Sequence, residues 1–562
     1  MLTLMLRPLL LAAVLAGAAA PAATAQRIYG TADPARGLAA LDTARARRHL
    51  ETLASDAFEG RGTGTPGERR AVEYVEREMR RIGLAPGAPD GTYRQRVPLL
   101  GSTPLNTQPL RFSRGDSSYA ATFVTDFTLS TDLADERAAL DGEIVFVGYG
   151  IANPGERWDD FKGVDVRGKI LLAFVNDPPA TGAEPALFQA DTLTYNGRWT
   201  YKYEEARRRG ARGILLIHTL GTAGYPYQVL SASAPREQIQ LATPPASPLT
   251  LKGWITQPVA DRLARWSGTT LDAWFEAAGR RDFRPQPLGI TLRAASDFRV
   301  RRFDGTNVVG TIRGRYRPHE AIVYSAHHDH LGITPELVAQ GRDGIYNGAV
   351  DNASGVAMLL TLAEAFQSGP PPSRSVTFVS TTAEESGLLG ATHYAGSPAT
   401  PLVRTIANLN VDSGNLLGRT RDLVGIGAER SELMAMLRAE AGREAMTVTP
   451  DSRPNQGLLY RSDQLAFARG GVPAVFFNTG RTFIGQSDDY FDRMENDYNL
   501  RRYHQPGDEV LPTFQYGGLL QQMRVAYRLG FDLADGTRRP AWRAGEAFGA
   551  TREADERAAG LR

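Results

Sequence analysis

The sequence contains no cysteine. This absence excludes disulfide bonds, thiolate metal ligands, a cysteine nucleophile and lipid attachment at an N-terminal cysteine. Any zinc bound by the protein must therefore be held by histidine, aspartate and glutamate side chains.

A strong charge of either sign is also lacking. The chain has 64 Lys and Arg residues against 62 Asp and Glu residues, which gives a formal net charge of +2. Such a balance produces no field that would attract nucleic acid or an anionic membrane surface. We therefore expect neither of these as a partner.

No hydrophobic run near the N-terminus is long enough to cross a membrane. The apolar run covers residues 9–20, whereas a spanning helix needs about 20 residues. Arg7 precedes the run and Ala23-Thr24-Ala25 follows it, a pattern typical of a secretory signal peptide. The sequence predicts a signal peptide over residues 1–25 and export to the periplasm or the exterior, with an uncleaved anchor as the alternative.

The length of 562 residues exceeds what one hydrophobic core holds, so two or three domains are expected. Hydrophobic periodicity predicts helices over residues 43–53 and 67–82, with a Gly-rich loop between them. Short alternating apolar runs over residues 110–293 predict a separate β-rich domain. The predicted domains are therefore a discontinuous one over 26–109 and 294–535, the insertion at 110–293, and a polar C-terminal tail at 536–562.

Strands and helices alternate from about Asn307 onward. Apolar strands are predicted over residues 321–326, 376–380 and 405–411, and a helix over 355–366. This order predicts an α/β fold with a mostly parallel sheet flanked by helices. Ligands in such folds bind at the carboxyl ends of the strands.

Five short motifs in this region place acids and histidines at strand ends or in loops. They are AHHDHLG with His327 and Asp329, GAVDNASG with Asp351, AEESG with Glu384 and Glu385, NVDSG with Asp412, and YHQPGDE with His504. Each motif alone is weak evidence, because such residues are often solvated or act as turn residues. Together, and in this order, they predict one site at one edge of the sheet.

The residue types fit a site with two metal ions. Zinc accepts histidine nitrogen and carboxylate oxygen, and a zinc pair ~3.5–4 Å apart needs a bridging carboxylate. Asp351 can bridge, with His327 and Asp412 completing one metal and Glu385 and His504 the other. The sequence therefore predicts two zinc ions per chain.

Two acids remain for other roles. On an extended segment residues two apart share a face, so Asp329 can lie behind His327 and accept its ring N–H. Glu384 is left as the general base, because adjacent side chains on extended chain point in opposite directions. His328 and His330 are expected only to line the cleft. Two roles are open for Arg461: binding a carboxylate of the substrate, or forming a salt bridge on the surface.

At these residues the chain resembles the co-catalytic zinc exopeptidase family that includes bacterial leucyl aminopeptidase, aminopeptidase S and glutamate carboxypeptidase. The resemblance implies the ligand sets His327, Asp351, Asp412 and Asp351, Glu385, His504, with Glu384 as base and Asp329 orienting His327. It also implies a cis peptide bond from Asp351 to Asn352. One departure is Gln464, where members commonly have histidine.

The resemblance also covers the insertion at 110–293, which looks like the protease-associated domain that many members carry. Its stretch DDFKGVDVRGKI at 159–170 is typical of secreted bacterial members. It implies an exported zinc exopeptidase acting on peptides, most often an aminopeptidase. Carboxypeptidase or dipeptidase activity on the same metal core and a non-catalytic receptor-like role are the alternatives. A dimeric carboxypeptidase and deacylase family shares the ligand order, but it usually places its extra domain between the fourth and fifth ligands.

Overall fold

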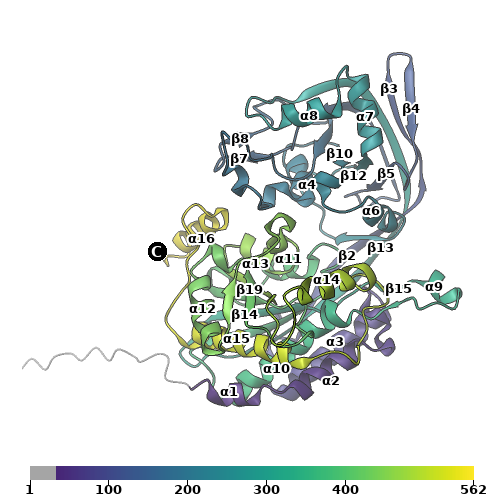
Figure 1. Cartoon of the computed structure of the whole chain (residues 1–562). Coiled ribbons are helices and arrows are strands. Elements are labelled where there is room, and N and C mark those ends of the chain that lie inside the picture. The colour runs from purple at the N-terminus through teal and green to yellow at the C-terminus, as the bar shows by residue number, and fades with distance from the viewer. Residues whose placement is uncertain (1–32, 562) are drawn as a thin grey trace, which may run out of the picture.

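The computed structural model describes residues 33–561. Figure 1 shows a larger lower lobe and a smaller upper lobe, joined by two long strands. Strand β2 (Arg94–Thr107) leads into the upper lobe and β13 (Gln286–Ile312) leads back, and the two pair antiparallel. The predicted signal peptide at 1–25 lies outside the described residues. Within residues 33–561 no helix has the length and apolar character that a membrane crossing requires.

The larger lobe is built on one mixed sheet in the order β1–β13–β17–β14–β18–β21–β19–β20. Strands β17, β14, β18 and β21 run parallel at its centre. On one side β13 is antiparallel to β17 and to β1, and on the other side β19 is antiparallel to β21 but parallel to β20. The bounds are β1 Ala85–Pro86, β14 Arg317–His327, β17 Arg374–Thr381, β18 Thr405–Asn410, β19 Asp422–Ile426, β20 Thr447–Thr449 and β21 Ala474–Thr479.

Helices cover both faces of this sheet. Along β14, Ile322 and Tyr324 belong to the main core, while Val323 packs into a second cluster on the opposite face. Successive side chains of a strand alternate between faces, so a strand buried on both sides reads as a continuous apolar run. The predicted fold class, an α/β sheet flanked by helices, is confirmed.

The flanking helices divide between the two faces. Those on the main-core face are α2 Thr43–Leu53, α3 Pro66–Ile82, α10 Ser354–Ser368, α12 Leu433–Arg443 and α15 Tyr516–Asp535, and those on the other face are α11 Leu389–Gly396 and α13 Gln464–Arg469. Helix α3 shows why the sequence predicts such bounds well. The Thr65 side chain caps its first turn, Pro66 begins it, and Gly83 ends it with a φ of 91°.

The upper lobe has its own sheet and its own hydrophobic core. Strands β6, β9, β10 and β12 run parallel, β5 and the first half of β13 border them antiparallel, and the hairpin β3–β4 extends the edge along β13. The bounds are β3 Leu110–Arg114, β4 Ser117–Ala121, β5 Phe127–Ser130, β6 Arg137–Phe146, β9 Ile170–Phe174, β10 Gly213–His218 and β12 Leu251–Thr256. The core includes Trp274, whose ring stacks on Phe146 with centroids 4.6 Å apart.

Helices complete the upper lobe and the C-terminus. The upper lobe carries α4 (Trp199–Arg208), α7 (Gln257–Trp266) and α8 (Leu271–Ala278). Helix α16 (Ala547–Ala558) lies in the segment whose polarity predicts a tail. Its Arg552 is buried, donates to Glu556 at 2.8 Å and to the carbonyl of Leu402 at 2.8 Å, and so attaches this segment to the larger lobe.

Asp132 ties three segments of the upper lobe together. Its fully buried carboxylate accepts two hydrogen bonds of 2.6 Å each from Arg207 and one of 2.5 Å from Lys252. It also accepts the backbone N–H of Leu249 at 2.9 Å. Burial alone would raise the pKa of Asp132, but Arg207 and Lys252 outweigh burial and lower that pKa to about 2.

We predict that Asp132→Asn lowers the free energy of unfolding by an amount that depends on pH. Because the folded-state pKa is lowered, the ionised carboxylate stabilises the fold above the unfolded value near 3.8, and this contribution is lost as the pH falls towards about 2. The difference in unfolding free energy between wild type and variant should therefore shrink by on the order of 2 kcal/mol as the pH falls through that range. Urea unfolding at several pH values measures it. The control is Asp141→Asn, in an exposed pair with Arg293. A gap that stays constant from pH 6 to pH 3 would contradict the prediction.

Candidate metal centre

The structure brings the five predicted ligands to one edge of the larger sheet. His327 is the last residue of β14, and Asp412 follows the end of β18 by two residues. Glu385 lies in the loop after β17, and Asp351 lies in a short helical turn, Ala349–Ala353, just before α10. His504 follows α14, Tyr490–Arg501.

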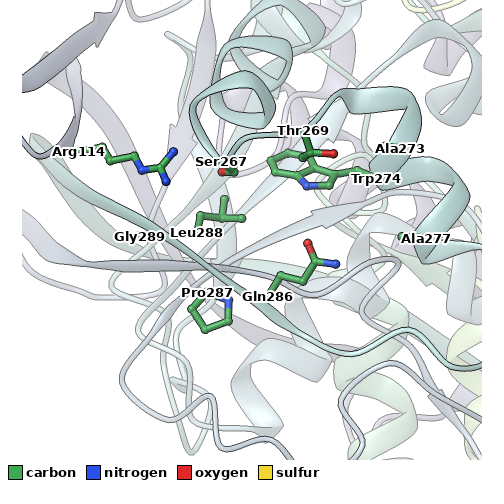
Figure 2. A pocket seen from close by; sticks show the side chains of 10 residues that line it. All are labelled: Arg114, Ser267, Thr269, Ala273, Trp274, Ala277, Gln286, Pro287, Leu288 and Gly289. Atoms are coloured by element: carbon green, nitrogen blue, oxygen red, sulfur yellow. The ribbon is translucent and has the colours of Figure 1, made fainter.

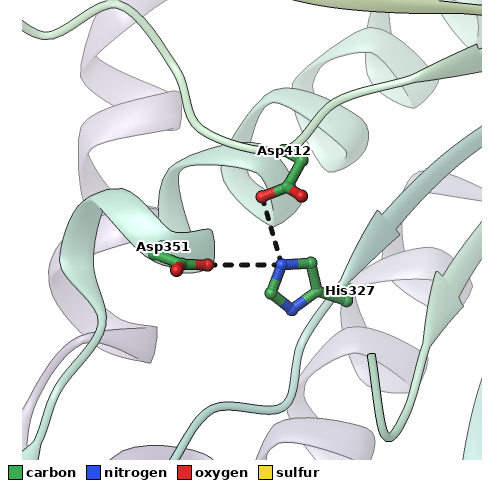
Figure 3. A group of neighbouring side chains, drawn as sticks. All are labelled: His327, Asp351 and Asp412. Atoms are coloured by element: carbon green, nitrogen blue, oxygen red, sulfur yellow. Dashed lines mark hydrogen bonds and ion pairs between the residues drawn. The ribbon is translucent and has the colours of Figure 1, made fainter. Parts of the chain in front are cut away.

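Asp351 lies between the two histidines. His327 Nε2 is 3.3 Å from Asp351 Oδ1 and 3.2 Å from Asp412 Oδ1, as Figure 3 shows. His504 Nε2 is 3.3 Å from Asp351 Oδ2 and 3.2 Å from Glu385 Oε2. Each oxygen of Asp351 therefore faces a different histidine, and each histidine faces one further acid.

His330 is a neighbour that the sequence analysis assigned only to the cleft lining. Its Nδ1 lies 2.6 Å from Glu385 Oε1, and its Nε2 is buried without a hydrogen-bond partner. Donor atoms of His330, Asp351 and Glu385 lie within 4.8 Å of one another, as do those of His327, Asp351 and Asp412. Nitrogen and carboxylate oxygen donors at this spacing fit zinc.

The charges of the site are mutually dependent. Burial alone would raise the pKa of Asp351, but hydrogen bonds from His327 and His504 outweigh it and hold that pKa well below its usual range. Burial would likewise lower the pKa of each histidine, whereas the neighbouring carboxylates raise it well above its usual range. The side chains thus stabilise one another in their charged forms.

Asp329 does not take the role predicted for it. Its Oδ1 lies 3.8 Å from His327 Nδ1, while its backbone carbonyl lies 3.1 Å from the same nitrogen. The carboxylate instead accepts the N–H of Glu384 at 3.0 Å, the N–H of Glu385 at 3.4 Å and the Thr63 hydroxyl at 3.2 Å. Strand β14 ends at His327, so the alternation on which the expectation rests stops there. Asp329 holds the glutamate loop and orients His327 through its carbonyl.

Glu384 lies beside the cluster, with Oε2 4.0 Å from His327 Nε2. Burial raises its pKa well above the usual range, and the charges of Asp412 and Glu385 add to this effect although His327 opposes them. A carboxylate with a raised pKa is suited to accept a proton near neutral pH. The preceding residue, Ala383, has a φ of 54°, a conformation that non-glycine residues rarely adopt.

The loops of Asp351 and Asp412 are joined by hydrogen bonds from the Asn352 side chain to backbone groups. The peptide bond from Asp351 to Asn352 is cis, as predicted. The Asn352 amide donates to the carbonyl of Val411 at 3.0 Å and accepts the N–H of Ser413 at 2.9 Å. The Asp508 carboxylate accepts the N–H of Asp351 at 3.0 Å. Asp508, four residues after His504 in its motif, has a positioning role that the sequence analysis missed.

Gln464 acts as an internal brace. Its side-chain oxygen accepts from the Asn410 amide at 2.8 Å, and its amide donates to the carbonyl of Leu459 at 2.9 Å. It is fully buried. Gln464 therefore joins the end of β18 to the loop that contains Leu459.

A separate hollow lies on the upper lobe. It has a volume of ≈ 410 Å³ and opens between the start of β13 and helices α7 and α8, as Figure 2 shows. Arg114, Trp274 and Gln286 are among its lining residues, and none of the predicted metal ligands belongs to it. The cluster at the sheet edge is therefore the candidate functional site.

The comparison with protein families matches residues 307–524 to peptidase family M28. These residues are therefore similar to a peptidase family M28 domain, and we call residues 307–524 the M28-matched segment. All five predicted metal ligands, together with Asp329 and Glu384, lie in the M28-matched segment.

Individual relatives cover smaller shares. "Aminopeptidase NAALADL1" of Mus musculus is 30% identical over 177 residues, covering 28% of this chain and 22% of the relative. A "Probable zinc metalloprotease" of Pyrenophora tritici-repentis is 26% identical over 232 residues, covering 36% of this chain and 51% of the relative. The chain thus spans between about a fifth and a half of the length of these curated relatives.

The fold extends over more of the chain than the sequence matches. The solved structure of an aminopeptidase from Aneurinibacillus sp. strain AM-1 aligns with a TM-score of 0.50 at 18% identity, covering 90% of this chain and 97% of that one. This likeness shows the fold alone.

Arg61 is a fully buried arginine that braces the M28-matched segment from outside it. Its guanidinium donates to the carbonyls of His328 at 2.8 Å, Leu53 at 2.7 Å, Asn347 at 2.6 Å and Gly348 at 3.0 Å. It therefore joins the loop after His327 to the loop before Asp351. Burial lowers its pKa to about 10, and the charges of Asp508 and Asp329 oppose this lowering. In the sequence Arg61 lies in a Gly-rich loop, and nothing in that loop indicates that the Arg61 side chain is buried.

We predict that Arg61→Met destabilises the metal-loaded protein strongly. Each buried carbonyl left without a donor costs ~1–3 kcal/mol, so the free energy of unfolding should fall by at least ~4 kcal/mol. Urea unfolding followed by circular dichroism measures this loss. Arg70→Met is the matched control, because Arg70 forms only a partly exposed ion pair with Glu59 and should change stability by less than ~1 kcal/mol. Equal losses in the two variants would show that the four carbonyl bonds do not brace the loops.

Proposed function

We propose that the protein is a zinc-dependent aminopeptidase that holds two zinc ions per chain. The observation that carries this proposal is the Asp351 carboxylate, which presents one oxygen to His327 and the other to His504. The relatives named aminopeptidase and zinc metalloprotease support the same activity. The alternatives are a carboxypeptidase or a dipeptidase using the same metal core.

The donor set divides into two groups that share Asp351. His327 and Asp412 would hold one zinc with Asp351, and Glu385 and His504 would hold the other. Zinc in such a site supplies Lewis-acid chemistry, polarising a carbonyl oxygen and lowering the pKa of water. His330, at 2.6 Å from Glu385, orients that carboxylate or competes for it.

The chain's own residues supply the proton transfers and the positioning. Glu384 accepts the proton of the water that attacks the scissile carbonyl, and returns a proton to the amine that leaves. Its burial and its acidic neighbours raise its affinity for that proton. Asp329 fixes its position through the 3.0 Å bond to the Glu384 N–H.

The acidic character of the centre favours a free amino end over a carboxyl end. Asp351, Glu384, Glu385 and Asp412 crowd one small volume. A peptide α-amine, with a reference pKa of about 7.7–8.0, is largely cationic near neutral pH and is attracted by such a cluster. A substrate carboxylate would be repelled by the same charges.

We propose two further properties from the sequence patterns. The pattern at residues 1–25 supports a signal peptide and hence export to the periplasm or the exterior. The stretch at 159–170 supports assignment of the upper lobe as a protease-associated domain.

Removal of the metal tests the centre itself. Dialysis against a strong chelator should abolish hydrolysis and the addition of zinc should restore it. Elemental analysis of the active protein should give about two zinc ions per chain. Asp351→Asn should retain fewer metal ions than wild type, because it weakens the one side chain that both histidines face. A fully active protein with one zinc per chain would rule out the shared site.

Blocked peptides test which end is cut. We expect acetylation of the amino end to lower kcat/KM of a short peptide by at least about tenfold, since the acetyl group removes the cation that the acids attract. A peptide amidated at its carboxyl end should still be cleaved, and the residue released from it should be the amino-terminal one. If the acetylated peptide is cleaved as fast as the free one and the amidated peptide resists, the enzyme is a carboxypeptidase.

A further inference from the structure

The loop that carries Arg461 borders the metal centre. The Thr381 hydroxyl donates to the Asp463 carboxylate, and the Asn410 amide donates to the Ser462 hydroxyl at 2.9 Å. Thr381 is the last residue of β17, which leads to Glu384, and Asn410 is the last residue of β18, which leads to Asp412. Arg461 therefore lies at the rim of the site and is exposed there.

The upper lobe contacts this same loop. The Leu193 N–H donates to the carbonyl of Pro454 at 3.0 Å, and the rings of Tyr195 and Tyr460 lie 5.8 Å apart. Arg198 follows three residues later, immediately before α4. Figure 1 shows α4 on the side of the upper lobe that faces α11 and α13. The contact thus brings Arg198 of one lobe towards Arg461 of the other.

Neither guanidinium has an acidic partner. Among residues 33–561 no carboxylate lies within 4.0 Å of Arg198 or Arg461. The Nε of Arg198 is buried and has no hydrogen-bond partner. Burial and the charge of Arg461 lower the pKa of Arg198 to about 10. Buried donors are nearly always paired, so an unpaired one beside a second cation points to a missing anion.

Tyr503 lies beside the metal centre. Its ring stacks on His504 with centroids 4.0 Å apart. The charges of Arg461 and Arg198 also interact with the Tyr503 hydroxyl. The Tyr503 side chain therefore contacts a predicted metal ligand and interacts electrostatically with both arginines.

We propose that Arg198 and Arg461 form a subsite for a carboxylate of the substrate, supplied by the free carboxyl end of a short peptide or by an acidic side chain. This subsite rests on the proposed peptidase function. Acids form the predicted metal centre and the two arginines lie at its rim, so the electrostatic field runs from negative at the centre to positive at the rim. A short peptide with a cationic amino end and an anionic far end is oriented by that field, and guanidinium groups suit carboxylates because of their paired donors.

The test uses zinc-loaded protein with Glu384→Gln, which removes the proposed base, so that binding is measured without turnover. The probes are Leu-Gln-amide as the neutral reference, Leu-Gln with a free carboxyl end, and Leu-Glu-amide with an acidic side chain. Titration calorimetry gives Kd for each probe. We expect at least one carboxylate probe to bind about ten- to a hundredfold more tightly than the reference, as expected for charge-assisted hydrogen bonds. The probe that gains affinity identifies the source of the carboxylate.

Arginine variants in the same background decide where the carboxylate binds. Arg198→Gln and Arg461→Gln should each lose most of the gain while binding Leu-Gln-amide within about twofold of the parent. Arg198→Lys, which keeps the charge, should keep part of the gain and provides a second variant if Arg198→Gln folds poorly. Arg265→Gln removes an exposed arginine of the upper lobe, on α7, and should keep all of it.

Two outcomes would overturn the subsite. One is equal affinity of the parent for all three probes, and the other is a gain that survives in both arginine variants. Failure of the proposed function is separate, because it appears as absent hydrolysis of all three probes by zinc-loaded wild type. Even if no probe is hydrolysed, the measured Kd values still show whether the two arginines bind a carboxylate.

Discussion

Repulsion among crowded, buried carboxylates is the constraint on which this structure depends. Asp329, Asp351, Glu384, Glu385 and Asp412 share one small region of the sheet edge. Two like charges 4 Å apart repel by about 4 kcal/mol at an effective dielectric constant of 20. Such a cluster persists only if cations offset it. His327 and His504 face the carboxylates directly, the buried Arg61 contributes a fixed positive charge behind them, and the two proposed zinc ions would carry most of the balance.

The same constraint explains why so many polar groups hold the loops rather than touch the centre. Loops of crowded acids would move apart unless their backbones were fixed. Asp329 accepts the N–H groups of both glutamates, Asp508 accepts that of Asp351, and Asn352 bonds to the loop of Asp412. Arg61 binds four carbonyls from three segments. The positions of the acids are therefore set by backbone hydrogen bonds, and the side chains are left to face one another.

The sequence predicts the features that depend on residues close together in the chain. The strands leading to His327, Glu384 and Asp412 are apolar runs followed directly by polar residues, so their strand-end positions could be predicted. The role of Asp329 could not, because it depends on where β14 stops and how the next residues turn. Arg61 reads as a surface residue of a Gly-rich loop, and its burial appears only when three distant segments meet. Helix α7 does show a helical apolar spacing, with Val259, Ala260, Leu263 and Ala264 buried, which the prediction of a β-rich domain overlooked. The long strand β13 could not be predicted as one element, because it is shared by two lobes.

The division between lobes separates two kinds of chemistry. All the predicted metal ligands lie in the larger lobe, which has its own core, and none of them lies in the upper lobe. The upper lobe has a second core and is joined to the larger lobe by the β2–β13 ribbon and by contacts such as Leu193 with Pro454. Arg198, immediately before α4, is not one of the predicted metal ligands and could change without removing one. Under the proposed function, the larger lobe would set the reaction type, and the upper lobe could vary the preference for the far end of the substrate.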